Sequence, residues 1–284
     1  AAASGDRPMI LALQVLILLA LLALTALLLH RSAPRFALAD RPAQRSIAVA
    51  TAGAILGAPF WWFGVPASFA WLLPPLAFRF LGAAALAFAA TGLTILWRPS
   101  PARIRLYLGM VALYLAPVVA AVLLLHRDRL DWQTPIAWAF LVVAGGLTIS
   151  STIALLGAPT PPGGTSPGPT EQRIWSAFGL LFALWALALY AWPAAPFPPL
   201  FLWATDPLSA RLIAVMPATL ALMAWGARNR QDLGRPAAIG YATYGFWVVI
   251  ACLLHGLAGR PLPWLYLGAL GLGSAWGFAR ALRR

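Results

Sequence analysis

The chain has 284 residues, of which 62% are hydrophobic and 10% charged, and its mean hydropathy is +0.81. A soluble domain of this length needs a polar surface that this composition cannot supply, so a soluble globular protein is excluded. All twenty basic residues are Arg, and with seven acids they give a net charge of +13. The Arg residues stand in short loops between apolar runs, a pattern that sets membrane topology and does not indicate nucleic-acid binding.

The first apolar run covers residues 9–29, and at 1.5 Å per residue a helix of this length crosses a hydrocarbon core of ~30 Å. A secretory signal peptide is the alternative, because residues 37–39 (Ala-Leu-Ala) resemble a cleavage site. The run is too long for a signal peptide, however, and four Arg residues follow it. We therefore expect an anchor helix and a cytoplasmic loop over residues 1–46. Because residue 1 is not Met, we expect a processed or incomplete N-terminus.

Eight further apolar runs follow, which predicts an all-α polytopic transmembrane bundle of about nine spans. They fall into two four-helix membrane units, residues 47–157 and 174–284. The stretch 158–173 between them is rich in Pro and Gly and predicts a linker. In chain order the expected spans are 47–64, 77–97, 106–125 and 135–157 in the first unit, then 174–192, 208–225, 237–255 and 264–279 in the second. Gly53 and Gly57, four residues apart in the first of these, predict a close helix contact.

The two units carry the same three motifs in the same order, which indicates an internal duplication. The pattern W-x-x-x-P-L-x-x-R begins at Trp71 and again at Trp203. Leu-Leu-His ends at His126 and His255, and P-x-x-W begins at residues 135 and 261. The offset between copies is 132 residues at the first motif, 129 at the second and 126 at the third, as loop deletions would produce.

The distribution of Arg predicts the orientation in the membrane. The loops 30–46, 98–105, 158–173 and 226–236, with the C-terminal tail, hold fourteen Arg and three acids, whereas the opposite side holds six Arg and four acids. Positively charged loops stay in the cytoplasm, so we expect the N-terminus outside and the C-terminus inside. Because each unit has an even number of spans, its two copies share one orientation and form a parallel repeat.

Arg79 and Arg211 are the duplicated charges near the outer ends of their helices. One interpretation is that they extend to the membrane interface or clamp the helix end to a carboxylate or to loop carbonyls. Asp206 is the candidate partner of Arg211, and Asp128 or Asp131 that of Arg79. The alternative interpretation is anion binding. We expect structural clamps at Arg79, Arg211 and Asp206.

His126 and His255 are the duplicated histidines, each at the outer end of a helix. Neutral imidazole ligates haem iron or the magnesium of a chlorin, so a pair at equal depth is a candidate pigment site. Histidines at helix ends are more often only hydrogen-bonded, and the second axial partner of a haem is missing. We therefore expect His126 and His255 not to be haem ligands.

No other motif in the sequence points to catalysis. A carboxylate pair, a Ser/His/Asp set, a CxxC and a Gly-rich phosphate loop are all missing, and His126 with Asp128 and Asp131 has no acidic counterpart in the second unit. The single cysteine, Cys252, excludes an internal disulfide and is interpreted as a packing residue. We expect no enzyme activity, no metal and no cofactor. Bound lipid is expected, and haem or chlorin is the weaker alternative.

The three duplicated motifs resemble those of a group of uncharacterised multi-pass bacterial membrane proteins in which a four-helix unit is often duplicated. The resemblance covers roughly residues 47–157 and 174–279. The resemblance implies this fold and a location in a bacterial plasma membrane. It does not imply an activity or any functional residue for this chain. The first helix departs from the four-plus-four plan.

Two classes of function remain open. The first is a non-catalytic accessory or scaffold subunit of a larger membrane complex, for example an energy-converting, photosynthetic or respiratory one, with membrane lipids and other subunits as partners. The second is a binding or transport protein that holds a lipid, quinone, pigment or other apolar ligand between the two units. The middle depths of the spans hold Thr, Ser and Tyr but no carboxylate or His, which counts against an ion-coupled carrier.

Overall fold

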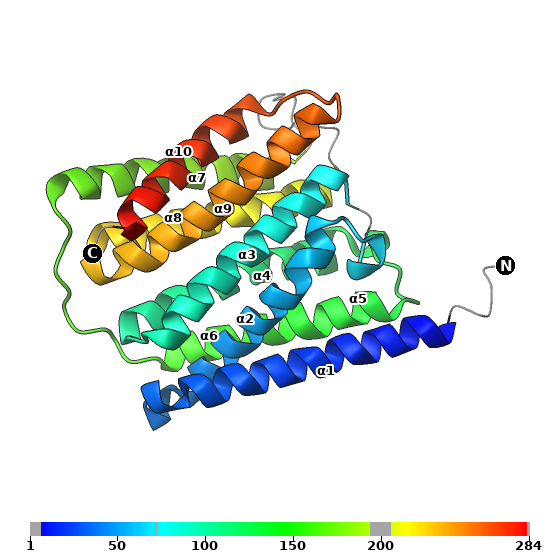
Figure 1. The fold of residues 1–284 in the computed structure, drawn as a ribbon, viewed down its shortest axis with the longest axis horizontal. Coiled ribbons are helices and arrows are strands. Elements are labelled where there is room, and N and C mark those ends of the chain that lie inside the picture. The colour runs from blue at the N-terminus through cyan, green and yellow to red at the C-terminus, as the bar shows by residue number, and fades with distance from the viewer. Residues whose placement is uncertain (1–6, 72, 194–205, 283–284) are drawn as a thin grey trace.

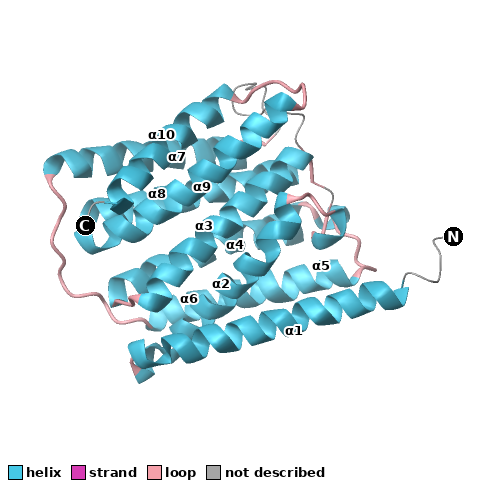
Figure 2. Cartoon of the chain, in the orientation of Figure 1, coloured by secondary structure: helices cyan, strands magenta, loops and turns pink. Residues whose placement is uncertain are grey.

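The computed structural model describes residues 7–71, 73–193 and 206–282, and these residues form helices and connecting loops without a β-strand (Figure 2). The helices are α1 Arg7–Ser32, α2 Arg41–Trp62, α3 Pro75–Trp97, α4 Pro101–Leu125, α5 Pro135–Phe140, α6 Gly146–Gly157, α7 Pro169–Ala191, α8 Pro207–Asn229, α9 Gln231–Leu257 and α10 Trp264–Leu282. A π-helical segment, Leu141–Gly145, joins α5 to α6, so residues 135–157 form one rod.

The helices lie side by side with α1 along one edge of the bundle and α7 and α10 at the opposite edge (Figure 1). Seven helical segments in the described residues are long and apolar enough to cross a membrane: Leu16–Arg35, Pro75–Trp97, Pro101–Leu125, Pro135–Gly157, Pro169–Ala191, Pro207–Asn229 and Gln231–Leu257. The expected all-α membrane-helix class is thus found. Helices α2 and α10 fall outside this set, and α2 has polar first turns that contain Arg41, Gln44 and Arg45.

Local sequence explains where many helices begin and end. Proline stands at one of the first two positions of α2, α3, α4, α5, α7 and α8, where its missing N–H is not needed and its fixed φ suits a helix. Helix α7 therefore begins at Pro169, inside the stretch predicted to be linker. Gly64 and Gly259 have positive φ values of 66° and 74°, and they follow the ends of α2 and α9.

Helices that are far apart in the sequence pack against each other, as do some that are adjacent in it. Helix α2 packs on α3, α7 on α8 and α9 on α10, while α3 also packs on α9 and α4 on α8. The core residues at these contacts are mainly Ala, Leu and aromatics, and Tyr107, Trp175 and Phe182 are fully buried. Helix α1 packs mainly against α2 and leaves most of its described leucines exposed.

Close helix approach occurs at glycines other than those predicted. A Cβ added at Gly53 would meet nothing within 4 Å, and one at Gly57 would meet only Trp61 of the same helix. At Gly82 of α3, by contrast, it would lie 2.9 Å from the backbone nitrogen of Trp62 in α2. The glycine that lets two helices approach closely is thus the one that faces a neighbouring backbone. The spacing of glycines along one helix does not show which glycine that is.

Candidate functional site

Arg211 and His126, two of the duplicated residues, contact each other at one end of the bundle. Arg211 lies near the start of α8, and His126 follows the last residue of α4. Nη1 of Arg211 lies 2.5 Å from Nε2 of His126. A guanidinium only donates hydrogen bonds, so this contact requires the Nε2 lone pair of a neutral imidazole whose proton is on Nδ1.

The charges around His126 favour this neutral form. Burial lowers the pKa of His126 below its ordinary value, and the positive charge of Arg211 lowers it further. Asp128 and Asp206 act in the opposite direction without reversing the shift, and Arg129 adds to the lowering. At neutral pH the imidazole therefore accepts the hydrogen bond from Arg211 and carries no charge of its own.

Asp206, the predicted partner of Arg211, has another set of contacts. Its Oδ1 accepts hydrogen bonds of 3.0 Å from the backbone nitrogens of Leu208 and Ser209, and Ser209 Oγ donates to its Oδ2 at 2.5 Å. It therefore caps the N-terminus of α8. In the parts of the chain that the structure describes, no ion pair joins Asp206 to Arg211, whose Nε is buried without a partner. The Cζ of Arg211 instead lies 5.8 Å from the ring centroid of Tyr190 in α7.

Arg79 and His255 are the other Arg and His of the repeated sequence motifs. Arg79 of α3 acts electrostatically on His255, which lies in the last turn of α9. The acids proposed for Arg79 are engaged elsewhere. Asp128 lies 3.8 Å from Arg129 across an exposed ion pair, and Asp131 Oδ1 accepts from the backbone nitrogen of Gln133 at 3.1 Å.

A small cavity lies among α3, α4, α8 and α9. Its volume is about 10 Å³, and it is lined by Ala77, Phe80, Leu81, Ala84, Tyr114, Leu212, Ile213, Met216 and Tyr244. This is room for about one water molecule. Ligand pockets are typically about 300–1,000 Å³, so this cavity is too small for a lipid, quinone or pigment in this conformation.

The histidine environment and the acid positions offer little to a metal or haem. Within the described ranges no three or more His, Cys, Asp and Glu side chains are grouped so that they could hold a metal ion. Nε2 of His126, the atom that would bind iron, already accepts from Arg211. The prediction about haem ligation itself stays a prediction.

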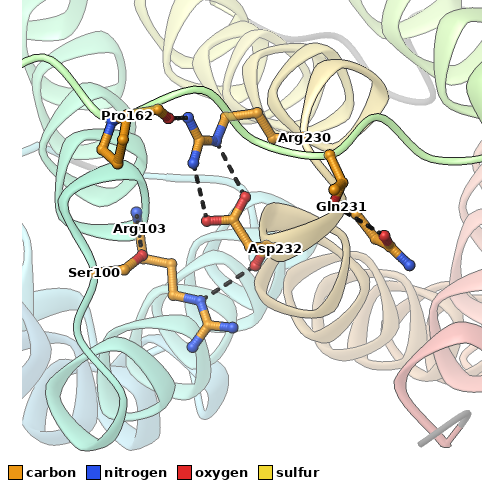
Figure 3. A network of polar contacts seen from close by, with 7 residues as sticks. Ser100, Arg103, Pro162, Arg230, Gln231 and Asp232 are labelled. Atoms are coloured by element: carbon orange, nitrogen blue, oxygen red, sulfur yellow. Dashed lines mark hydrogen bonds and ion pairs between the residues drawn. The ribbon is translucent and has the colours of Figure 1, made fainter.

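A second polar cluster lies at the opposite, Arg-rich end of the bundle (Figure 3). Both carboxylate oxygens of Asp232 in α9 accept from Arg230, at 3.1 and 3.3 Å, and its backbone oxygen accepts from Arg103 of α4 at 3.2 Å. Arg230 also donates to the Pro162 carbonyl at 2.6 Å. The cluster therefore connects the stretch that contains Pro162 with α4 and α9.

Sequence reasoning missed that Arg211 and His126 contact each other. The signal was present, because both motifs occur once per unit and at the same end of the helices. Searches against family models, curated proteins and solved structures found no match to this chain.

Proposed function

We propose that this chain is a non-catalytic integral membrane protein that serves as an accessory or scaffold subunit of a larger membrane assembly. In this proposal nine rods cross a bacterial plasma membrane, with the Arg-rich end in the cytoplasm and the Arg211–His126 end outside. Helix α1 is the anchor, and α2–α6 and α7–α10 are the two related units. The single observation that carries the proposal is the tight packing among α3, α4, α8 and α9, where the cavity has a volume of only about 10 Å³.

The relation between the units is supported by reciprocal packing. If α3 corresponds to α8 and α4 to α9, then the contact of α3 with α9 corresponds to the contact of α8 with α4. The polar contacts agree with this correspondence. The Tyr107 hydroxyl of α4 donates to the Phe88 carbonyl of α3 at 3.1 Å, and the Tyr241 hydroxyl of α9 donates to the Leu220 carbonyl of α8 at 2.9 Å. Such an arrangement fits a parallel repeat about an axis along the membrane normal.

A scaffold role is favoured because the interior is filled while broad apolar faces remain exposed. The cavity among α3, α4, α8 and α9 has a volume of about 10 Å³, which is too small for a substrate. Helix α1 exposes Leu16, Leu19 and Leu22, each more than half accessible, and adds little to the core. An apolar helix that stands outside the packed units is available to lipid and to helices of a partner subunit.

Site-specific photocrosslinking from α1 tests this function. Photoreactive residues at Leu19 and Leu22 should form crosslinks to one recurring polypeptide in stoichiometric amount. In mild detergent the protein should elute as a complex larger than this chain. The same groups at Leu180 and Leu184 of α7 serve as exposed apolar controls. If all four positions give only lipid adducts and the protein elutes alone, the subunit proposal fails.

The alternative, a binding or transport protein, rests on the presence of a cavity between the units with Tyr114 and Tyr244 in its lining. A lipid, quinone or pigment would require the units to separate there. Organic extraction and a visible spectrum of the purified protein decide between the two functions. A quinone or pigment bound one per chain, and lost on Ala84→Trp, would favour the binding protein.

A further inference from the structure

Two tyrosine hydroxyls in the part of the chain that the structure describes have no hydrogen-bond partner. Tyr107, Tyr190 and Tyr241 each donate to a backbone carbonyl of another helix, at distances of 3.1, 3.0 and 2.9 Å. Tyr114 of α4 and Tyr244 of α9 make no such bond within the described ranges, although Tyr244 is only 2% exposed. A buried hydroxyl without a partner is unfavourable, so these two positions need an explanation.

Both of these tyrosines line the cavity among α3, α4, α8 and α9. Its other lining residues are Ala, Phe, Leu, Ile and Met, so the two hydroxyls are the only side-chain groups there that can donate a hydrogen bond. The cavity volume of about 10 Å³ is close to the ~10–15 Å³ that one water molecule needs. Two hydroxyls without a partner therefore border a space that fits one small polar molecule.

The lining of this cavity also comes from matching positions of α3 and α8. Six lining residues form three pairs whose members are 132 positions apart, namely Phe80 with Leu212, Leu81 with Ile213 and Ala84 with Met216. This is the offset between the two W-x-x-x-P-L-x-x-R patterns. Tyr114 and Tyr244 are 130 positions apart, one more than the offset of the Leu-Leu-His motifs. The cavity is thus formed by similarly placed residues of both halves of the chain.

We propose that this cavity binds one water molecule, which forms hydrogen bonds with the hydroxyls of Tyr114 and Tyr244 and so links α4 to α9. Buried waters typically make two to four hydrogen bonds to polar groups that otherwise lack a partner. Both tyrosines lie near the middle of helices long enough to cross a membrane, where the hydrocarbon core supplies no other polar partner. The site rests on the cavity and its hydroxyls and does not depend on the proposed scaffold function.

A density map of the full-length protein that shows ordered waters tests the site directly. We expect a single peak in the cavity, about 2.7–2.8 Å from both hydroxyl oxygens, which is the usual distance of an O–H···O hydrogen bond. The same peak should be lost in Tyr114→Phe and in Tyr244→Phe, because either substitution removes one of its polar partners.

Unfolding in mild detergent supplies a second measurement. Tyr114→Phe and Tyr244→Phe should each raise the unfolding equilibrium constant about tenfold, because the remaining hydroxyl then lacks a partner. The double variant should also stay near tenfold, instead of the hundredfold expected of independent sites, because one water serves both hydroxyls. As a matched control, Tyr241→Phe removes a hydroxyl that donates to the Leu220 carbonyl, and its effect should multiply with that of Tyr114→Phe.

A peak within reach of both hydroxyls, together with the smaller than multiplicative effect in the double variant, supports the water site. An empty cavity, a peak that does not reach both hydroxyls, or a direct hydrogen bond between them would overturn the proposal. Fully multiplicative effects of Tyr114→Phe and Tyr244→Phe would overturn it as well. If a variant does not fold, the density in the parent protein still decides.

Discussion

Arg211 and His126 are 85 positions apart in the sequence, yet Nη1 of one lies 2.5 Å from Nε2 of the other. The contact joins the start of α8 to the end of α4. Since the partner is an imidazole and not a carboxylate, the strength of this link depends on the hydrogen-bonding geometry of Arg211 and on the protonation of His126.

Substitution of Arg211 should weaken the contact between α4 and α8. Arg211→Lys keeps the charge but loses the planar fork, and Arg211→Ala removes the donor entirely. We expect both to insert normally and to lose thermal stability in detergent, by about 1–3 kcal/mol for Ala and less for Lys. Unchanged melting temperatures in both variants, with loss of an anionic ligand, would contradict the clamp and favour the binding protein.

Acidification should destabilise the protein through His126. Its pKa is lowered in the folded state by burial and then by Arg211, whereas the unfolded chain titrates near the ordinary value of about 6.5. The unfolded state therefore binds more protons below about pH 6.5, and stability falls as the pH falls through that value.

The control is His126→Gln, which offers Arg211 an acceptor oxygen but does not titrate. Melting temperatures are compared at pH 7 and pH 5. His30 and His255 are common to both proteins, so the difference between them reports His126 alone. An equal drop in parent and variant would show that His126 does not contribute.

Gly277 of α10 should tolerate no side chain. A Cβ there would lie 2.5 Å from the Ala242 nitrogen and 2.6 Å from the Ala238 oxygen, both backbone atoms of α9. We expect Gly277→Ala to cost about 1–3 kcal/mol in the free energy of unfolding, because the helices must separate. Gly268→Ala in the same helix meets nothing within 4 Å and should be neutral or slightly stabilising.

Asp232 should control the accessibility of the linker. Asp232→Ala frees Arg230 from its two carboxylate contacts and weakens its hold on the Pro162 carbonyl. Limited proteolysis should then cut within residues 158–168 several times faster than in the parent. Asp128→Ala, at the exposed ion pair of the other end, should leave that rate unchanged. Equal rates in all three proteins would show that the linker is held by other contacts.

Sequence reasoning was sufficient to predict the all-helical class and the approximate positions of the long apolar helices. Apolar runs such as 106–125 and 208–225 lie within α4 and α8, because a membrane helix must satisfy its backbone internally and be apolar along its length. The observed helices begin earlier than the predicted spans where the first turns are polar or begin with Pro. This is the case for α7, which begins at Pro169, and for α2, whose first turns are polar.

Which polar groups contact each other depended on how the helices pack, and the sequence did not predict it. The sequence places Asp206 five residues before Arg211, but the free N–H groups at the start of α8 engage that carboxylate first. His126 then becomes the partner because α4 packs on α8. Likewise Gly277 faces the backbone of α9 and leaves no room for a side chain, whereas a Cβ at Gly53 would meet nothing within 4 Å. Contact between helices depends on which residue faces a neighbouring backbone, and the spacing of residues along one helix does not show this.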